Sequence, residues 1–215
     1  MGAGGHNDPL RRARWSESSL KIPIKFVLRE GEFGDAVELH FGSMAPGGYA
    51  WVFPKERGAN IGLGIQNKFS KGRSLNSLAD GFISNYEGDI TFRGAGSLPM
   101  SGSIKQFVKG NHLLVGDSAG MVLPSNGAGI TIAMVGGRIA GQTVVSHLDE
   151  GTSLHEYEKE WKRQMGSVMR NSKLSFKIGS WIMRLPDWVL NLAFNPVSKP
   201  FVWRFVTCRK PFFIF

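Results

Sequence analysis

The stretch "HLLVGDSAGMVLPSNGAGITIAMVGG", residues 112 to 137, limits the possible folds of this chain more than any other. A short apolar run, "HLLV", ends at Gly116 and Asp117, and a loop dotted with glycines follows. After Gly127 the residues are rich in Ala and Gly and continue in a helical pattern. The stretch therefore predicts a buried strand, a loop and a helix, with the loop at the carboxyl edge of a sheet, where ligand sites of α/β proteins lie.

The residues of this loop have the chemistry of a ligand site. Asp117 can accept hydrogen bonds from ligand hydroxyls, and Gly127 and Gly129 allow a ligand to approach the backbone closely. Free amides at a helix start favour anionic or electron-rich atoms. The spacing therefore indicates a phosphorylated cofactor, while a tight strand–helix connection with close packing remains the alternative.

A second region predicts an antiparallel sheet. Four segments between residues 20 and 66 have strand character and are separated by turn residues: "LKIPIKFVLR", "DAVELHFG", "GGYAWVFP" and "ANIGLGIQ". Apolar residues at helical spacing predict a short helix over residues 74 to 87. Further strands are expected near 90 to 95 and 103 to 109, and mostly helix after Gly127.

Alternation within this region suggests an apolar slot. In "PGGYAWVFP" the period of two places Tyr49, Trp51 and Phe53 on one face of a strand. The next expected strand carries Gly62 and Gly64 on alternate positions. An aromatic face beside a face without side chains can form a long apolar slot. Ordinary cross-strand packing of aromatic rings onto glycine is the alternative.

Charge and composition restrict the partners. Lys and Arg number 26 against 17 Asp and Glu, which gives a net charge of +9. From Lys173 onward there are seven basic residues and one acidic residue, interleaved with many Trp and Phe. No nucleic-acid-binding motif is present, so we expect no nucleic-acid partner. A basic aromatic tail is typical of a segment at a membrane surface, or of a helical tail packed on its own domain, and no stretch is long and apolar enough to predict a membrane span.

The cysteine and histidine residues of the sequence do not indicate a metal site or an intrachain disulfide. Cys208 is the single cysteine, and the five histidines are scattered without ligand spacing. We therefore expect no metal site. The N-terminus lacks an apolar signal core, so we expect a cytoplasmic protein.

Two motifs carry a resemblance to a known family. "GDSAGMVLPSNGAGI" resembles the second flavin motif of the FAD-dependent hydroxylase and geranylgeranyl reductase superfamily, and "PGGYAWVFP" fits the pattern Pro-x-x-Tyr-x-Trp-x-Phe-Pro of geranylgeranyl reductases. The resemblance implies that Asp117, following Gly116, holds the FAD ribityl chain. It also implies that a loop and helix start face the pyrophosphate and the isoalloxazine, namely Gly127, Ala128, Gly129 and Ile130.

The N-terminal stretch adds a third match. "GAGGHNDPLRR" resembles Gly-Ala-Asp-Gly-x-x-Ser-x-x-Arg from the middle of the superfamily, but Gly4 replaces the Asp and Asp8 replaces the Ser. No Gly-x-Gly-x-x-Gly loop for the ADP half of FAD is found. We therefore expect the C-terminal portion of such an enzyme, with an N-terminal half missing or supplied by a partner chain, and weak or no FAD binding by this portion alone.

The resemblance also implies a domain plan. We expect a mixed α+β fold in which an antiparallel substrate-binding sheet joins the last strand–helix unit of a glutathione-reductase-like FAD domain. The expected boundaries are 1–19 for a remnant of the FAD-binding domain, 20–109 for the substrate-binding sheet, 110–150 for the strand–helix unit and 151–215 for a helical, basic and aromatic C-terminal region.

The activity that the resemblance implies is reduction of carbon–carbon double bonds in geranylgeranyl lipids, with FAD as cofactor and an unidentified external electron donor. Tyr49 is the candidate catalytic residue, and the substrate-binding candidates are Tyr49, Trp51, Phe53, Gly62 and Gly64. A peripheral contact with the inner face of the cell membrane is expected through the C-terminal region. The alternatives are a flavin monooxygenase or halogenase of the same fold, and a non-catalytic lipid-binding remnant.

Overall fold

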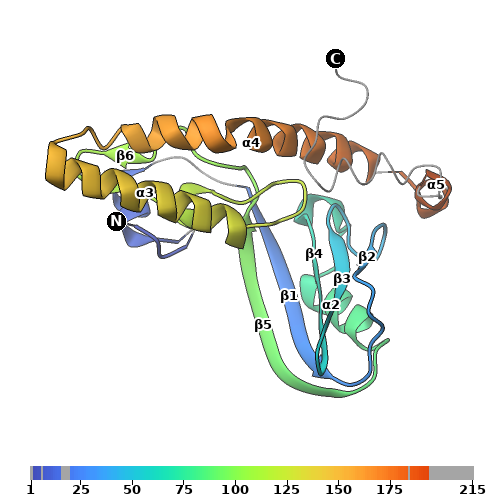
Figure 1. Ribbon diagram of the computed structural model, residues 1–215. Coiled ribbons are helices and arrows are strands. Elements are labelled where there is room, and N and C mark those ends of the chain that lie inside the picture. Colours follow the sequence, from blue (N-terminus) through green and yellow to red (C-terminus); the bar gives the residue numbers. More distant parts are fainter. Residues whose placement is uncertain (1, 6, 16–19, 184, 194–215) are drawn as a thin grey trace. The chain divides into compact units, whose positions relative to one another are not determined.

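The computed structural model describes residues 2–5, 7–15, 20–183 and 185–193, and these form two compact units (Figure 1). The first, here called the helical unit, comprises residues up to 21 and residues 98–178. The second, here called the sheet unit, comprises residues 22–97 and those described from 179 onward. The segment 194–215, which is the last third of the predicted membrane-contacting region 151–215, lies outside the described residues.

The sheet unit is built on five strands in the order β2-β3-β4-β1-β5. Their bounds are Lys21–Glu30 (β1), Glu38–His40 (β2), Tyr49–Lys55 (β3), Gly58–Gly64 (β4) and Asp89–Pro99 (β5). β4 pairs antiparallel with both β3 and β1, as the alternating segments predict. The unit also contains the 3-10 turn η1 (Asn67–Phe69) and the helices α2 (Leu75–Ile83) and α5 (Asp187–Ala193).

The two faces of this sheet have different roles. Ala50, Val52, Ile61 and Leu63 are at most 2% exposed and share a core with residues of α2 such as Phe82. Since side chains alternate along a strand, the intervening residues of β3 and β4 lie on the opposite face. The apolar core under α2 therefore fixes which face the aromatic residues of β3 occupy.

The helical unit is organised around two long helices that lie side by side in Figure 1. Its elements are α1 (Pro9–Arg14), β6 (Val108–Lys109), β7 (His112–Leu113), the 3-10 turn η2 (Gly116–Ala119), α3 (Ile130–Glu150) and most of α4 (Glu156–Ile182). Leu114, Met121, Ile139 and Tyr157 form the centre of its core and are at most 1% exposed. No helix in the described part of the chain is long and apolar enough to cross a membrane.

Side chains of α4 replace part of a predicted strand. The expected strand 103–109 is wrong for residues 103–107, and only β6 remains. The backbone amides of Phe107 and Val108 donate to Oε1 of Glu158 at 2.6 and 2.9 Å, so they are satisfied by a helix carboxylate. The Tyr157 hydroxyl donates to the Leu114 carbonyl at 3.1 Å, and burial raises the pKa of this phenol. These contacts anchor α4 on the segment that leads into η2.

Candidate functional site

The loop after β7 makes a sharp turn built on glycine. Gly116 and Gly120 both have φ of 66°, a left-handed conformation that favours glycine. The amide of Gly120 donates to the Asp117 carbonyl at 3.0 Å, which closes η2. A parallel bridge between Gly2 and Leu114 lies beside this segment. The short turn therefore places Asp117 directly after a buried strand, as the sequence predicts.

The carboxylate of Asp117 lies next to the start of α3. A Cβ built on Gly129 would be 3.6 Å from Oδ1 of Asp117 and 3.2 Å from the Val122 side chain. Of the six residues predicted to bind the cofactor, Gly116 and Asp117 thus lie on η2, and Gly127, Ala128, Gly129 and Ile130 form the approach to α3. The structure brings the two motif halves together at one helix end.

The N-terminus of α3 is open. Gly127 has φ of 75°, and the Asn126 side chain accepts a hydrogen bond from the Ala128 amide at 3.0 Å. Gly129 is the N-cap and has no side chain to bond the first amides of this 21-residue helix, while Ile130 is 81% exposed. A long helix whose first amides have no side-chain cap favours an anionic or electron-rich group. The geometry of these residues therefore fits a flavin nucleotide.

The N-terminal stretch shows why Gly4 and Asp8 depart from the family pattern together. The Asp8 carboxylate caps α1 and accepts hydrogen bonds from the amides of Gly4, Leu10 and Arg11 at 2.7 to 3.1 Å. A Cβ on Gly4 would be 2.9 Å from this carboxylate, so an aspartate at position 4 would bring two carboxylates together. Burial alone would raise the pKa of Asp8, but the backbone hydrogen bonds outweigh it and the pKa is lowered.

Arg11, which matches the final Arg of the N-terminal pattern, was not among the predicted site residues, but it lies beside the loop of Asp117. Its side chain is only 5% exposed, and Nη1 donates to the Asp117 carbonyl at 3.4 Å. The match of Arg11 to the Arg of the pattern could have indicated this position, and the pair Asp8-Pro9 is typical of an N-cap followed by the first helical position, which starts the helix that carries Arg11.

In the sheet unit, the aromatic residues of β3 form a continuous row. Ring centroids are 6.1 Å apart for Phe41 and Tyr49, 5.8 Å for Tyr49 and Trp51, and 5.8 Å for Trp51 and Phe53. The Trp51 indole also donates to the Asn60 side chain at 2.8 Å. The predicted common face of Tyr49, Trp51 and Phe53 is confirmed, and the row extends beyond it to Phe41.

The predicted glycines lie beneath this row. The register pairs Trp51 and Phe26 with Gly62, and Tyr49 and Ile24 with Gly64. A Cβ on Gly62 would be 2.5 Å from Phe26 Cβ and 2.7 Å from Trp51 Cζ2. Flanking side chains therefore occupy the space above Gly62, as the packing alternative expects, and this face is a surface of rings rather than a groove stripped to backbone.

Exposure differs along this surface. Phe53 is 36% exposed and Phe92 on β5 is 51% exposed, whereas Trp51 is 9% exposed. Burial raises the pKa of the Tyr49 phenol, which therefore keeps its proton at neutral pH. A neutral hydroxyl within an apolar aromatic row can position or protonate an apolar substrate. No cluster of three metal-ligating side chains occurs among the described residues.

Comparison with known proteins agrees with this arrangement. Residues 22–95 match the family model of the geranylgeranyl reductase catalytic domain. A digeranylgeranylglycerophospholipid reductase from Methanocaldococcus jannaschii is 36% identical over 192 residues, which cover 81% of this chain and 48% of that protein. The chain thus spans about half the length of this curated relative.

Solved structures with the same fold include flavoenzymes. A geranylgeranyl bacteriochlorophyll reductase-like protein from Thermoplasma acidophilum has a TM-score of 0.75 at 24% identity, over 92% of this chain and 53% of that chain. A probable FAD-dependent monooxygenase from Pseudomonas aeruginosa has a TM-score of 0.58 at 13% identity, over 85% of this chain and 55% of that chain. At these identities the likeness concerns the fold, which is the expected mixed α+β fold.

Proposed function

Because the chain belongs to the geranylgeranyl reductase family, we propose that it acts in the FAD-dependent reduction of carbon–carbon double bonds in geranylgeranyl lipids. The observation that carries the proposal is the aromatic row of β3, which lies within the matched residues 22–95 and in the same chain as the open helix start of α3. The relatives are named for a digeranylgeranyl glycerophospholipid, and we propose a substrate of this class.

The residues of the helical unit would hold the cofactor. Bound in its reduced form, FAD supplies a hydride to the double bond. The amides at the start of α3 would bind the anionic or electron-rich part of the flavin, and the glycines at 127 and 129 carry no side chain that could cover these amides. The Asp117 carboxylate would accept hydrogen bonds from the ribityl hydroxyls.

The residues of the sheet unit would hold the isoprenoid chain. The rings of Tyr49, Trp51 and Phe53 offer an apolar surface that excludes water and aligns the chain for reaction. Addition across a double bond also requires a proton, and the Tyr49 hydroxyl, whose pKa is raised by burial, can hold one at its Oη atom. Gly62 and Gly64 would set the depth of the surface by letting the rings lie close to the sheet.

Two features separate this function from the monooxygenase or halogenase alternative. The fold is common to all of them. The complete Pro-x-x-Tyr-x-Trp-x-Phe-Pro segment, residues 46–54, is expected in reductases and not in hydroxylases. The identity of 36% to a named lipid reductase points the same way.

Peripheral membrane contact is part of the proposal. Trp181 is 65% exposed and Trp188 is 71% exposed, and both belong to the sheet unit. Exposed indoles favour the membrane interface, where their apolar body and polar N–H are both accommodated. Sedimentation with anionic and neutral liposomes tests the contact. Equal binding to both would count against an anionic membrane surface.

The reductase activity is tested with FAD, a chemical reductant and a digeranylgeranyl phospholipid under anaerobic conditions. The proposal expects the oxidised flavin absorption to return as the lipid gains two hydrogen atoms per reduced bond, measured by mass spectrometry. Tyr49→Phe should slow this reaction about tenfold or more, because removing a general acid has effects of about 10²–10⁴ and water can substitute in part. Tyr86→Phe, in the core beside α2, is the matched control. Reduced flavin bound to the protein with an unchanged lipid would contradict the proposal.

A further inference from the structure

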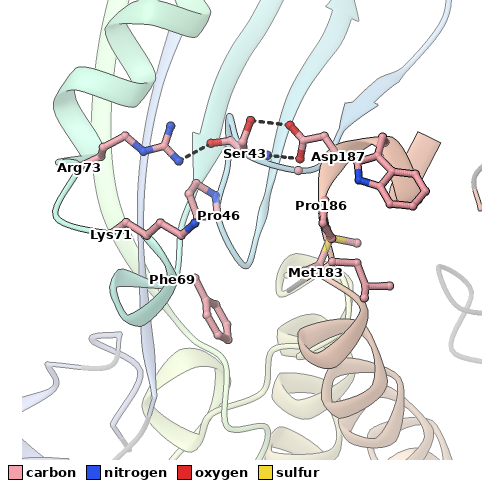
Figure 2. Close-up of a pocket in the computed structure, with 11 residues that line it drawn as sticks. Ser43, Pro46, Phe69, Lys71, Arg73, Met183, Pro186 and Asp187 are labelled. Carbon is pink, nitrogen blue, oxygen red and sulfur yellow. Dashed lines mark hydrogen bonds between the residues drawn. The ribbon is translucent and has the colours of Figure 1, made fainter. Parts of the chain in front are cut away.

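A cavity of about 610 Å³ in the sheet unit lies at the beginning of the aromatic row. Gly42 and Pro46, which line it, belong to the segment between Phe41 and Tyr49, whose rings are in contact. Most of the remaining lining comes from two other segments, residues 69–73 at the end of η1 and after it, and Met183 with residues 185–188 at the start of α5 and before it (Figure 2). Three segments distant in sequence thus meet beside the proposed isoprenoid surface.

The cavity combines cations with an apolar wall. Lys71 and Arg73 line it together with Phe69, Met183 and Trp188. Figure 2 shows Lys71 and Arg73 extending from one loop toward Pro46 and Ser43. Cationic side chains next to aromatic and aliphatic groups match an amphiphile whose head is anionic and whose tail is a hydrocarbon.

The one acidic side chain of the lining, Asp187, is hydrogen-bonded to Ser43. Asp187 accepts hydrogen bonds from the Ser43 amide at 3.0 Å and from the Ser43 hydroxyl at 2.6 Å. It packs directly on Gly42, where a Cβ would be 2.6 Å from Oδ1. Arg73 donates to the Ser43 carbonyl at 2.7 Å, so the guanidinium and the Asp187 carboxylate lie on opposite sides of Ser43 in Figure 2.

Lys71 has no hydrogen-bond or ion-pair partner among the described residues, and its backbone is unusual. Its φ of 51° makes it the one non-glycine residue with positive φ in the described part of the chain. Glycine, asparagine or aspartate is the ordinary choice for this conformation, so a lysine here is noteworthy. The loop therefore presents an ammonium group, without a counter-ion, at the edge of the cavity.

We propose that this cavity binds the phosphate headgroup of the lipid substrate, with Lys71 and Arg73 pairing with the phosphate oxygens. The apolar wall of Phe69, Met183 and Trp188 then contacts the first part of the hydrocarbon chain, which continues toward Tyr49. This inference rests on the proposed function, since it assigns a headgroup site to the substrate of that reaction. The 71% exposure of Trp188 at the cavity favours a lipid at a membrane surface over a soluble phosphate.

The test compares geranylgeranyl phosphate with geranylgeraniol, each in non-ionic micelles, by titration calorimetry of the full chain. The phosphate should bind about tenfold more tightly, as expected for a charge-assisted pair. Lys71→Gln should remove most of this difference and leave geranylgeraniol binding unchanged, and Lys71→Arg should retain it. Lys55→Gln, an exposed lysine at the end of β3, is the control and should change neither affinity.

Four outcomes decide between the possibilities. Loss of the phosphate preference in Lys71→Gln alone supports the headgroup site. Equal binding of both lipids by the unaltered chain overturns the headgroup site and leaves the isoprenoid surface intact. Inorganic phosphate that competes as strongly as the prenyl phosphate would assign the cavity to a soluble anion and overturn the lipid headgroup. Binding of neither lipid contradicts the proposed function itself.

Discussion

The helix start of α3 and the aromatic face of β3 both contain glycines, but they require glycine to different degrees. At α3, a Cβ built on Gly129 would be 3.2 Å from the Val122 side chain and 3.6 Å from Oδ1 of Asp117, and the neighbouring Ile130 is exposed. On β4, a Cβ built on Gly62 would be less than 3 Å from atoms of Phe26 and Trp51. A Cβ at position 129 would press on Val122 by a few tenths of an ångström, whereas a Cβ at position 62 would overlap Phe26 and Trp51 outright, so the requirement for glycine is stricter at position 62.

Substitutions at the two sites should therefore affect different properties, ligand affinity at α3 and folding stability at β3. The first site consists mainly of backbone amides and one carboxylate, so its ligand affinity depends on access to the backbone. The second consists of packed rings, so changes there alter folding as well as binding. Three substitutions can break or sharpen this contrast.

Gly62→Ala should have the largest effect. The new Cβ would meet the Lys25 carbonyl oxygen at 2.6 Å, in addition to Phe26 and Trp51, and backbone cannot move aside easily. We expect a loss of about 2 to 3 kcal/mol in the free energy of unfolding, as for overpacked cores. Urea unfolding followed by tryptophan fluorescence measures it. Gly96→Ala on β5, where the nearest atom would be 3.9 Å away, is the control and should change stability little. Equal effects of the two would show that the rings are not packed on Gly62.

Gly129→Ala should affect ligand affinity instead. Gly129 has φ of −117°, so alanine adds no backbone strain, but its methyl group would press on Val122 at 3.2 Å, and stability should fall by about 1 kcal/mol or less. The methyl group would narrow the approach to the first amides of α3, and we expect FAD affinity to fall about tenfold, or about 1.4 kcal/mol. Flavin fluorescence quenching measures this. Unchanged affinity would place the flavin away from this helix start.

Asp8→Asn tests the N-terminal cap and should have the smallest effect. The folded pKa of Asp8 is lowered from 3.8, so the stability that its carboxylate contributes is present above pH 3.8 and is lost as pH falls through the lower folded value. Asparagine still caps a helix but does not titrate. The difference in unfolding free energy between the two proteins, up to about 1 kcal/mol at neutral pH, should therefore shrink in acid. If the difference in unfolding free energy between the two proteins did not change with pH, the charge of the Asp8 cap would make no contribution to stability.

Sequence patterns predicted the parts of the molecule that depend on local chemistry. The loop of residues 116–130 was predictable because a strand end, Asp117 and two glycines are consecutive signals. The alternation in β3 likewise predicted the common face of its aromatic residues. The domain boundaries derived from the sequence, and the roles of the predicted site residues, remain predictions.

The remaining features depend on residues far apart in the chain. The strand expected at 103–109 is reduced to β6, and the Phe107 amide just before β6 donates to Glu158, about 50 residues away, instead of to a neighbouring strand. The proposed headgroup cavity joins three segments, and Pro46 at the start of "PGGYAWVFP" is its one link to a motif, so no sequence pattern indicated the cations from the segment after η1. Asp8 was visible only as a departure from a pattern, and its capping role requires the positions of three amides.

In the proposed function, flavin would bind at the helix start of α3 and the isoprenoid chain at the aromatic row of β3. Affinities for FAD and for geranylgeraniol in micelles, each measured with Asp117→Ala and with Phe53→Ala, test it most directly. Asp117→Ala should lower FAD affinity about tenfold or more through loss of charge-assisted hydrogen bonds and leave lipid affinity unchanged, whereas Phe53→Ala should lower lipid affinity alone. Asp149→Ala, at the exposed end of α3, is the control for the first variant. The assignment of the two surfaces would be contradicted if each variant lowered the affinity for both ligands equally. It would also be contradicted if Asp117→Ala lowered only lipid affinity and Phe53→Ala only FAD affinity.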